Sequence, residues 1–590
     1  MKFLGVNWDH PSGASLLKDG EIAAAVSEER FSRRKNDMSF PAKALKFCAD
    51  ADKAGGKTDG VGIASLDVSY TGMMYRYATM SIEDHVREQR QVWYPRLYEN
   101  KQVDDALVFK DRWDKEQYPK EYWAEYDPAK KATYAKDAAN IIADYCGVAR
   151  DKAVRVEHHW CHAYYAYFCS PYRQGKTLVV TIDGFGDGLN ATVSIAEGNE
   201  LKRIYSTDKC VLGRIYRHMT LILGMKPLEH EFKIMGLAPY AKAKYVMPAF
   251  DVFNDVIKLN GIEFEWKNKP KDSYFHFKDK LEGLRFDNIA GGLQLWLETV
   301  LCQWVENLVK ETGISRLVVG GGVAMNIKAM GKVAMLPCVT ELFVAGSGSD
   351  DSNCIGAAIG AAAHFNGGKV PGDVRINNLY LGPEVREDLP GVLAKAGANP
   401  ELAVESDPSD ERVCRLLMKG CVLGRCFGAM EFGQRALGNR SILADPTIPE
   451  LVPKINSMIK NRDFWMPFAP MVLDSYSQRY LVNPKNVASP HMTVGFETTA
   501  EGYEAMRAAC QPADRSARPQ ILRRTDNPQM YSLLSKFEQL TGRGAILNTS
   551  FNLHGYPIVT NAAEAYDVFL NSELEALLLP GALIVKKKVL

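Results

Sequence analysis

The chain has 590 residues, of which 46% are hydrophobic and 24% charged, as is typical of globular proteins. A single hydrophobic core rarely grows beyond about 250–300 residues, so we expect at least two domains. Lys and Arg total 72 against 71 for Asp and Glu, giving a net charge of +1. That balance excludes a global attraction to nucleic acid or to anionic membranes.

The cysteines and the apolar stretches predict a cytoplasmic protein. The 12 cysteines are scattered without a C-x-x-C pair, which favours reduced, mostly buried thiols over disulfides or a zinc finger. MKFLGVNWDHPSG at the start lacks the apolar core of a signal peptide, and ALLLPGALIV near the end is too short to span a bilayer. We therefore expect no membrane partner.

Two segments share a pattern of strand, loop and hairpin. In residues 2–31, the strand KFLGVN precedes the loop DHPSGAS and a hairpin with its turn at residues 18–20. In residues 177–206, the strand TLVVTID precedes the loop GFGDG and a hairpin with its tip at residues 198–199. The repeat predicts a duplicated α/β core.

The remaining elements suggest where the first domain ends. The segment near 75–150 is rich in aromatic and charged residues without alternation, which predicts a helical insertion. Residues 316–333 predict a strand, a glycine turn and a helix, and 341–365 predict a strand, a polar loop and a close-packing helix of small residues. Glycines and prolines interrupt the periodicity at 367–388. We expect domains of residues 1–370 and 371–590.

A metal site is predicted by two histidines and two aspartates. In VEHHWCHAYYAYF, which has helical spacing, His158 and His162 lie four residues apart and project from one side. Asp183 ends a predicted strand, and Asp350 follows another. Such a donor set suits Fe(II), Mn or Zn better than Mg or Ca. The spacing is compatible with one histidine packed in the core and the other exposed to solvent. It also leaves open His159 as the ligand in place of His158.

Two glycine loops are candidates for nucleotide binding. GGGVAMN, at 320–326, lies between a predicted strand and helix, where backbone N–H groups attract anions. GFGDG, at 184–188, could cradle phosphates similarly, although ordinary tight turns explain both loops equally well. The candidate residues are Gly184, Gly186, Gly320, Gly321, Gly322 and Asn326.

The second domain has cations clustered around predicted turns. Arginine forks match phosphate and carboxylate groups bidentately, so converging cations would suit phosphoryl or adenylyl chemistry. Surface arginines paired with acids are the alternative. The candidate residues are Arg435, Arg440, Lys460, Arg462, Arg518 and Ser550.

Together these motifs resemble the NodU/CmcH-type O-carbamoyltransferases, which modify antibiotics, nodulation signals and related small molecules. The matching stretches follow in order along nearly the whole chain. They are SEERFSRRK, EHHWCHA, DGFGDG, HEFKIMGLAPY, GGGVAMN, the Asp350 loop, MEFGQRALGNRSILADP, IKNRDFWMPFAP and ILNTSFN.

The resemblance implies an α/β first domain with the duplicated ASKHA (actin-like) fold, similar to proteins that transfer threonylcarbamoyl to tRNA. The family carries iron there, and the ligands implied by position are His158, His162, Asp183 and Asp350. His10 matches a family histidine next to the transferred group, so we expect it to help activate the acceptor.

The resemblance implies a YrdC-like α/β second domain that binds carbamoyl phosphate and ATP, with Mg²⁺, and forms carbamoyladenylate. Carbamate is a poor electrophile, and coupling it to AMP supplies a leaving group before transfer to a small-molecule hydroxyl. An enclosed path would protect this hydrolysable intermediate. The matching residues are Arg435, Arg440, Lys460, Arg462, Arg518, Ser550 and Asn552.

Several positions depart from the family pattern. The usual H-D-A-S-A motif has Pro11 as its second residue here, F-R-P-F-A-P has Met466 in place of an arginine, and G-E-P-I has Tyr556. The D-G-x-A-R-x-Q motif reads DRSARPQ. These changes leave open whether substrate contacts and the acceptor differ from those of other members.

Three other functions are alternatives. A tRNA threonylcarbamoyl enzyme should have a basic face, which the net charge of +1 does not favour. A hydrogenase-maturation carbamoyltransferase would add an acylphosphatase module and paired C-x-x-C motifs, which this chain lacks. A non-enzymatic ASKHA nucleotide-binding protein is the third. The sequence leaves open the acceptor, the native metal and whether the chain forms a homodimer.

Overall fold

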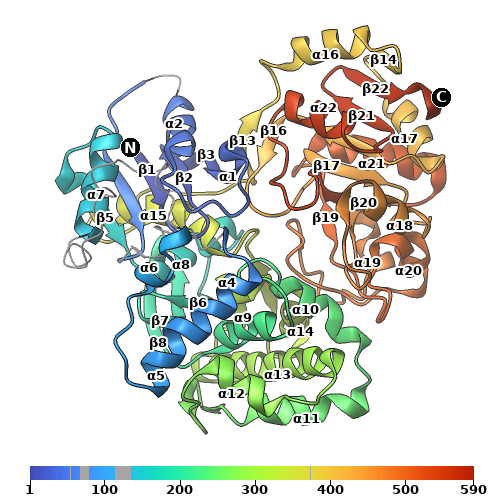
Figure 1. The fold of residues 1–590 in the computed structure, drawn as a ribbon. Coiled ribbons are helices and arrows are strands. Elements are labelled where there is room, and N and C mark those ends of the chain that lie inside the picture. The colour runs from blue at the N-terminus through green and yellow to red at the C-terminus, as the bar shows by residue number, and fades with distance from the viewer. Residues whose placement is uncertain (53–54, 67–78, 113–133, 373, 590) are drawn as a thin grey trace. The chain divides into compact units, whose positions relative to one another are not determined.

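The computed structural model describes residues 1–52, 55–66, 79–112, 134–372 and 374–589. The chain divides into two compact units (Figure 1). The first comprises Met1–Glu29 and Asn36–Asn377, and the second comprises Arg30–Lys35 and Asn378–Leu590. Within the described ranges, no helix combines the length and apolarity needed to cross a membrane.

The first sheet of unit 1 has the order β3-β2-β1-β4-β5. β1 pairs antiparallel with β2 and parallel with β4, which in turn pairs parallel with β5. The predicted β2–β3 turn is confirmed, with Asp19 and Gly20 at φ of 49° and 88°. The strands are β1 (Lys2–Asn7), β2 (Gly13–Lys18), β3 (Glu21–Ser27), β4 (Gly60–Ala64) and β5 (Ala153–Val156).

The second sheet of unit 1 repeats this arrangement, with the order β8-β7-β6-β11-β12. β6 pairs antiparallel with β7 and parallel with β11, which pairs parallel with β12. The strands are β6 (Thr177–Gly186), β7 (Leu189–Glu197), β8 (Glu200–Thr207), β11 (Arg316–Gly320) and β12 (Glu341–Val344).

One boundary in this sheet differs from the prediction. We expected a loop from residue 184, but β6 continues to Gly186, and Asp187 and Gly188 form the turn with φ of 48° and 84°. The D-G pair supplies the two positive φ angles of a tight hairpin, so the flanking glycines stay in the strand.

α15 (Asn353–Phe365) packs on the first sheet and α8 (His158–Cys169) on the second, and the two helices also pack closely against each other. A Cβ on Gly5 would lie 1.9 Å from the carbonyl oxygen of Cys354 on α15. A Cβ on Gly356 would lie 2.0 Å from the carbonyl oxygen of Cys161 on α8. The predicted close packing of the small-residue helix is therefore confirmed.

The described parts of the predicted insertion are largely helical, and residues 67–78 and 113–133 lie outside the described residues. Its helices are α4 (Ile82–Glu88), α5 (Tyr94–Tyr98), α6 (Asp105–Val108) and α7 (Tyr134–Tyr145). The other elements of unit 1 are α2 (Ala42–Asp50), α9 (Leu212–Ile222), α10 (Glu231–Leu237), α11 (Ala243–Asn254), β9 (Ile257–Asn260), β10 (Glu263–Trp266), α12 (Ser273–Lys280), α13 (Phe286–Thr312) and α14 (Ile327–Met335), and the short α1 (Glu29–Ser32) begins at its edge.

Unit 2 is built on an eight-stranded sheet in the order β14-β22-β21-β15-β17-β20-β18-β19. On β17, Ile442 and Ala444 join one hydrophobic cluster and Leu443 joins another, so helices cover both faces. The strands are β14 (Leu402–Ser406), β15 (Leu423–Cys426), β17 (Arg440–Ala444), β18 (Ala469–Leu473), β19 (Gln520–Leu522), β20 (Ala545–Ser550), β21 (Ala576–Leu579) and β22 (Ala582–Lys586), and β13 (Tyr380–Glu384) pairs with β16 (Ala429–Glu431).

The helices of unit 2 divide between the two clusters. Those beside the cluster of Ile442 are α16 (Leu389–Ala398), α18 (Leu451–Ile455) and α22 (Ala562–Leu570). Those beside the cluster of Leu443 are α17 (Asp410–Met418) and α21 (Pro528–Thr541). Two short helices are α19 (Ser477–Tyr480) and α20 (Ala500–Met506).

A segment from near the start of the chain belongs to unit 2, which we did not predict. The Arg30 guanidinium donates to the carbonyl oxygen of Gly433 at 2.7 Å. Arg33 donates to the carbonyl oxygens of Pro557 and Ile558 at 3.0 and 2.8 Å. These hydrogen bonds place residues 30–35 with unit 2 although the sequence around them belongs to unit 1.

Candidate active sites

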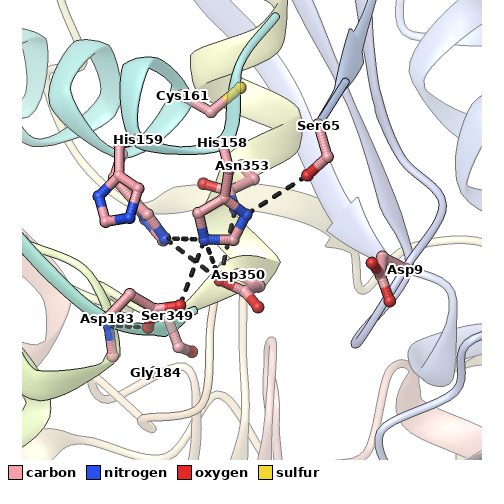
Figure 2. Close-up of polar contacts among 12 residues, drawn as sticks. Asp9, Ser65, His158, His159, Cys161, Asp183, Gly184, Ser349, Asp350 and Asn353 are labelled. Carbon is pink, nitrogen blue, oxygen red and sulfur yellow. Dashed lines mark hydrogen bonds and ion pairs between the residues drawn. The ribbon is translucent and has the colours of Figure 1, made fainter. Parts of the chain in front are cut away.

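Four potential metal ligands converge in unit 1 (Figure 2). The Nε2 atoms of His158 and His162, both on α8, lie 3.0 Å apart. His158 Nε2 is 3.2 Å from Asp183 Oδ2, near the end of β6. His162 Nε2 is 3.2 Å from Asp350 Oδ1, in the short turn before α15. The four ligand atoms all lie within 4.8 Å of one another.

The start of α8 fixes which histidines face the cluster. Glu157 caps the helix by accepting hydrogen bonds from the backbone N–H groups of His159 and Trp160, at 2.9 and 3.1 Å. His158 and His162 then lie one turn apart. His159 Nδ1 instead lies 2.8 Å from Thr181 Oγ1, and His159 is not one of the four converging ligands.

The charged groups of the cluster shift one another's pKa values. Burial lowers the pKa of His158, but Asp350 and Asp183 outweigh it and raise that pKa to about 10. Burial and the adjacent His158 lower the pKa of His162 to about 3. Burial and Asp183 raise the pKa of Asp350 to about 7. Asp183 has its pKa held below the usual range by His158, although burial opposes this.

This donor set fits a divalent transition metal. Two imidazoles and two carboxylates at these separations match the ligand preferences of Fe(II), Mn and Zn. A cation there would offset the repulsion that raises the pKa of Asp350. The four residues that we predicted as metal ligands from the sequence are therefore close enough to bind one ion.

The predicted glycine loops lie against these ligands. A Cβ on Gly186 would lie 2.2 Å from Cδ2 of His158, so the histidine ring needs a glycine there. The backbone N–H of Gly322 donates to Asp183 Oδ1 at 2.8 Å, and a Cβ on Gly322 would lie 2.6 Å from that oxygen. Gly321 has φ of 89°, and its Cβ would lie 2.2 Å from the carbonyl oxygen of Ile182.

The other members of this group have local partners as well. Gly184 accepts a hydrogen bond from Asn190, and a Cβ on Gly320 would lie 3.0 Å from Cβ of Ala166. Asn326 caps α14 and exchanges two hydrogen bonds with Gln294, at 2.9 and 3.0 Å. Nucleotide binding by the two loops stays a prediction.

His10 is half-buried and close enough to the ligand cluster for Asp183 to influence its pKa. Burial and the charge of Arg217 lower the pKa of His10 to about 4, although Asp183 raises it. Its Nδ1 atom is buried without a hydrogen-bond partner among the described residues. The imidazole is therefore neutral at neutral pH and can accept a proton.

In unit 2, Lys460 and Arg462 lie beside the end of β20. Lys460 Nζ donates to Ser550 Oγ at 3.1 Å and to Asn552 Oδ1 at 2.7 Å. Arg462 donates to Thr549 Oγ1 at 3.0 Å and stacks its guanidinium over the ring of Phe468. The structure thus brings together four residues that the sequence predicted for one site.

Positively charged side chains lie close together around Arg462 and lower one another's pKa values. Burial, Arg435 and Arg462 lower the pKa of Arg518 far below its usual value. Burial and the charge of Arg435 lower the pKa of Arg462 to about 10. Burial, Arg462 and Lys35 lower the pKa of Lys460. No described carboxylate raises any of these three pKa values, so the cluster is suited to hold an anion.

Arg440 does not join this cluster, contrary to our prediction. It is completely buried, and its guanidinium donates to backbone carbonyl oxygens. The acceptors are those of Phe427 at 2.6 Å, Thr560 at 2.9 Å and Pro383 at 3.0 Å. Because these bonds occupy the guanidinium, Arg440 supports the framework of the site instead of presenting a charge to a substrate.

Two residues of this site were missed in the sequence. Lys35 contributes charge next to Lys460, and the SEERFSRRK motif contained it, but its place in unit 2 could not be predicted from local pattern. Glu431 is buried and accepts hydrogen bonds from the N–H groups of Leu437 and Arg440, at 2.7 and 3.1 Å. It therefore shapes the loop that carries Arg435.

Comparison with known proteins decides the family. Residues 2–362 match the family model of the carbamoyltransferase N-terminus, and residues 414–586 match that of the carbamoyltransferase C-terminus. The chain belongs to the carbamoyltransferase family. The predicted resemblance to the NodU/CmcH type and the prediction of an enzyme that transfers a carbamoyl group are confirmed.

Several curated relatives share much of the carbamoyltransferase sequence. An uncharacterized protein of Methanocaldococcus jannaschii is 30% identical over 99% of this chain and 100% of its own length. Nodulation protein NolNO of Sinorhizobium fredii is 27% identical over 98% of this chain and 79% of its own length. The 3'-hydroxymethylcephem-O-carbamoyltransferase of Streptomyces clavuligerus is 32% identical over 56% of this chain and 60% of its own length.

Solved structures resemble the carbamoyltransferase only weakly. The T. kodakarensis HypF structure matches 62% of this chain with a TM-score of 0.32 and 13% identity, and the chain spans 48% of its length. A ROK family glucokinase from Streptomyces griseus in complex with glucose and AMPPNP matches 61% of this chain and 98% of its own, with a TM-score of 0.26 and 10% identity. These scores are too low to identify a fold or a ligand.

Proposed function

We propose that this carbamoyltransferase is ATP-dependent and uses two active centres, one in each unit. The cation cluster of unit 2 forms carbamoyladenylate from carbamoyl phosphate and ATP. The histidine–aspartate centre of unit 1 then passes the carbamoyl group to a hydroxyl of a small molecule such as an antibiotic, a toxin or another secondary metabolite. The observation that carries the proposal is the group of Arg435, Arg462 and Arg518, in which neighbouring positive charges lower the pKa values of Arg462 and Arg518.

In unit 2, the cations offset the negative charge of the phosphates and orient them. Water attacks carbamoyl phosphate and breaks its bond to phosphate, which gives carbamate and inorganic phosphate. A carbamate oxygen forms a bond to the α-phosphorus of ATP, supplied with Mg²⁺, while the bond to pyrophosphate breaks. Lys460, fixed by Ser550 and Asn552, and Arg518 stabilise the charge that develops on the phosphoryl oxygens.

In unit 1, the acceptor oxygen attacks the carbamoyl carbon and AMP leaves. His10 is neutral and takes the proton from the acceptor hydroxyl. His158, His162, Asp183 and Asp350 would hold Fe(II), with Mn or Zn as alternatives. Such an ion supplies positive charge that polarises a bound oxygen.

We further propose that unit 1 is a duplicated ASKHA domain and unit 2 is YrdC-like. The two sheets of unit 1, with the same strand order and directions, support the duplication. The net charge of +1 supports a small-molecule acceptor over tRNA.

The test is pyrophosphate release from ATP by the purified protein. We expect release that requires carbamoyl phosphate. ADP as the product would contradict adenylation and favour a kinase-like reaction. A screen of hydroxylated metabolites with both co-substrates should then find the acceptor by a mass gain of about 43 Da, a covalent modification by one carbamoyl group.

A further inference from the structure

Ser65 lies next to one of the ligand histidines, in a segment for which we predicted no functional residue from the sequence. Its hydroxyl oxygen is 3.3 Å from His158 Nδ1, across the ring from the Nε2 atom that faces the carboxylates (Figure 2). Ser65 is 7% exposed, so water does not readily replace this contact. The residue follows β4, while His158 begins α8.

The backbone of Ser65 is tied to the chain just before α8. Its N–H donates to the carbonyl oxygen of Val156 at 2.8 Å. Its own carbonyl oxygen accepts a hydrogen bond from Arg155 at 3.0 Å. Both partners belong to β5, the strand that leads into the helix of His158.

Asp187 completes this connection from the β6–β7 turn. Its carboxylate accepts hydrogen bonds from the backbone N–H of Leu66 at 2.9 Å and from that of His158 at 2.7 Å. The residue after Ser65 and the first residue of α8 are thus held by the same carboxylate. The hydroxyl of Ser65 therefore reaches His158 from a backbone that is fixed on both sides.

The backbone conformation of Ser65 is one that favours glycine. Its φ is +70°, in the left-handed region that glycine adopts without steric cost and a residue with a Cβ does not. The hydrogen bonds described for its backbone would also be available to glycine. What serine adds at this position is the hydroxyl beside His158.

We propose that Ser65 is a positioning residue of the metal centre, an inference that rests on the metal site proposed above. A neutral imidazole that binds an ion through Nε2 carries its proton on Nδ1. That N–H would donate to Ser65 Oγ, which fixes the tautomer and the ring orientation of His158. Within the described part of the chain, Nδ1 of His162 has no such partner.

Two substitutions separate positioning from folding. Ser65→Ala removes the hydroxyl and keeps the strained φ, whereas Ser65→Gly removes the hydroxyl and relieves the strain. We expect both variants to bind Fe(II) or Co(II) about 10- to 100-fold more weakly than wild type in chelator competition. We also expect Ser65→Gly to unfold at a higher temperature than Ser65→Ala. The absorption spectrum of the Co(II) form should change in both.

Ser194→Ala is the matched control, because Ser194 is buried on β7 and its hydroxyl has no hydrogen-bond partner among the described residues. This variant should keep wild-type metal affinity. If metal affinity follows thermal stability, so that Ser65→Gly binds like wild type, the hydroxyl has no positioning role and the inference is overturned. If wild type itself binds no metal, the proposed metal centre fails and the inference fails with it. Equal binding by wild type and both Ser65 variants overturns the inference alone.

Discussion

The ring of His158 occupies space that a glycine provides. A Cβ on Gly186 would lie 2.2 Å from Cδ2 and Cγ of this ring, and the ring also contacts Ser65 and both ligand carboxylates. A ring held on so many sides cannot move without losing a ligand distance. The second glycine of DGFGDG, Gly186, is therefore explained by packing around a ligand.

Gly186→Ala should weaken metal binding by at least about tenfold, because the added methyl group displaces a metal-ligating ring. Gly184→Ala is the control, since a Cβ at Gly184 meets no atom within 4 Å although it lies beside Asp183. Both variants would be measured by chelator competition with Fe(II). Equal affinities would contradict the steric role of Gly186.

In unit 2, Arg518→Ala should reduce ATP–pyrophosphate exchange by about 100-fold or more, because it removes a half-buried cation that stabilises phosphoryl charge. Arg507→Ala removes an exposed arginine that pairs with Glu504 and should leave the exchange rate unchanged. Exchange would be followed with labelled pyrophosphate and carbamoyl phosphate. An unchanged rate in Arg518→Ala would argue against adenylation at this cluster.

At the scale of single elements, α2 depends on a carboxyl group from outside the helix. Its N-cap residue Pro41 offers no side-chain hydrogen bond, and Glu28 accepts from the N–H groups of Ala44 at 2.8 Å and Lys43 at 3.3 Å. Burial raises the pKa of Glu28 to about 7 against these hydrogen bonds. The carboxyl group is therefore protonated in the folded protein over a pH range where it is ionised in the unfolded chain.

The stability of unit 1 should consequently fall as pH rises through this range. A raised pKa contributes stability fully below the unfolded value of 4.5, and this contribution is lost as pH rises through about 7. From about pH 5 to pH 8, wild type should lose up to roughly 3 kcal/mol of unfolding free energy relative to Glu28→Gln, whose amide does not titrate. Denaturant unfolding at several pH values measures this, and parallel pH profiles would contradict it.

Elements with strong local signals were predictable from sequence. The D-G pair at Asp19 fixed a hairpin through its two positive φ angles, and the helical spacing at His158 placed two ligands on one side of α8. Burial and long-range position were not predictable. Arg440 has the same local appearance as Arg435, yet backbone carbonyl groups surround it. No local sequence pattern predicts that residues 30–35 belong to unit 2.

At the scale of the whole molecule, each of the two candidate sites draws its charged residues from a single unit. The metal-ligand cluster lies within unit 1, and the cations next to Arg518 lie within unit 2. The two half-reactions should therefore be separable by mutation. His162→Ala should lose bound metal and carbamoyl transfer while it keeps ATP–pyrophosphate exchange, and Arg518→Ala should keep the metal while it loses exchange.

An equimolar mixture of these two variants tests whether the intermediate stays with one polypeptide. Carbamoyladenylate made by His162→Ala would have to cross bulk water to reach the intact metal centre of Arg518→Ala, and hydrolysis competes with that transfer. We expect the mixture to carbamoylate the acceptor at under about a tenth of the wild-type rate, because only an intramolecular transfer has a high effective concentration. Mass spectrometry of the acceptor measures the rate. Recovery to the wild-type level would show that the adenylate travels freely through solution, and the two centres would then act as independent enzymes on one chain.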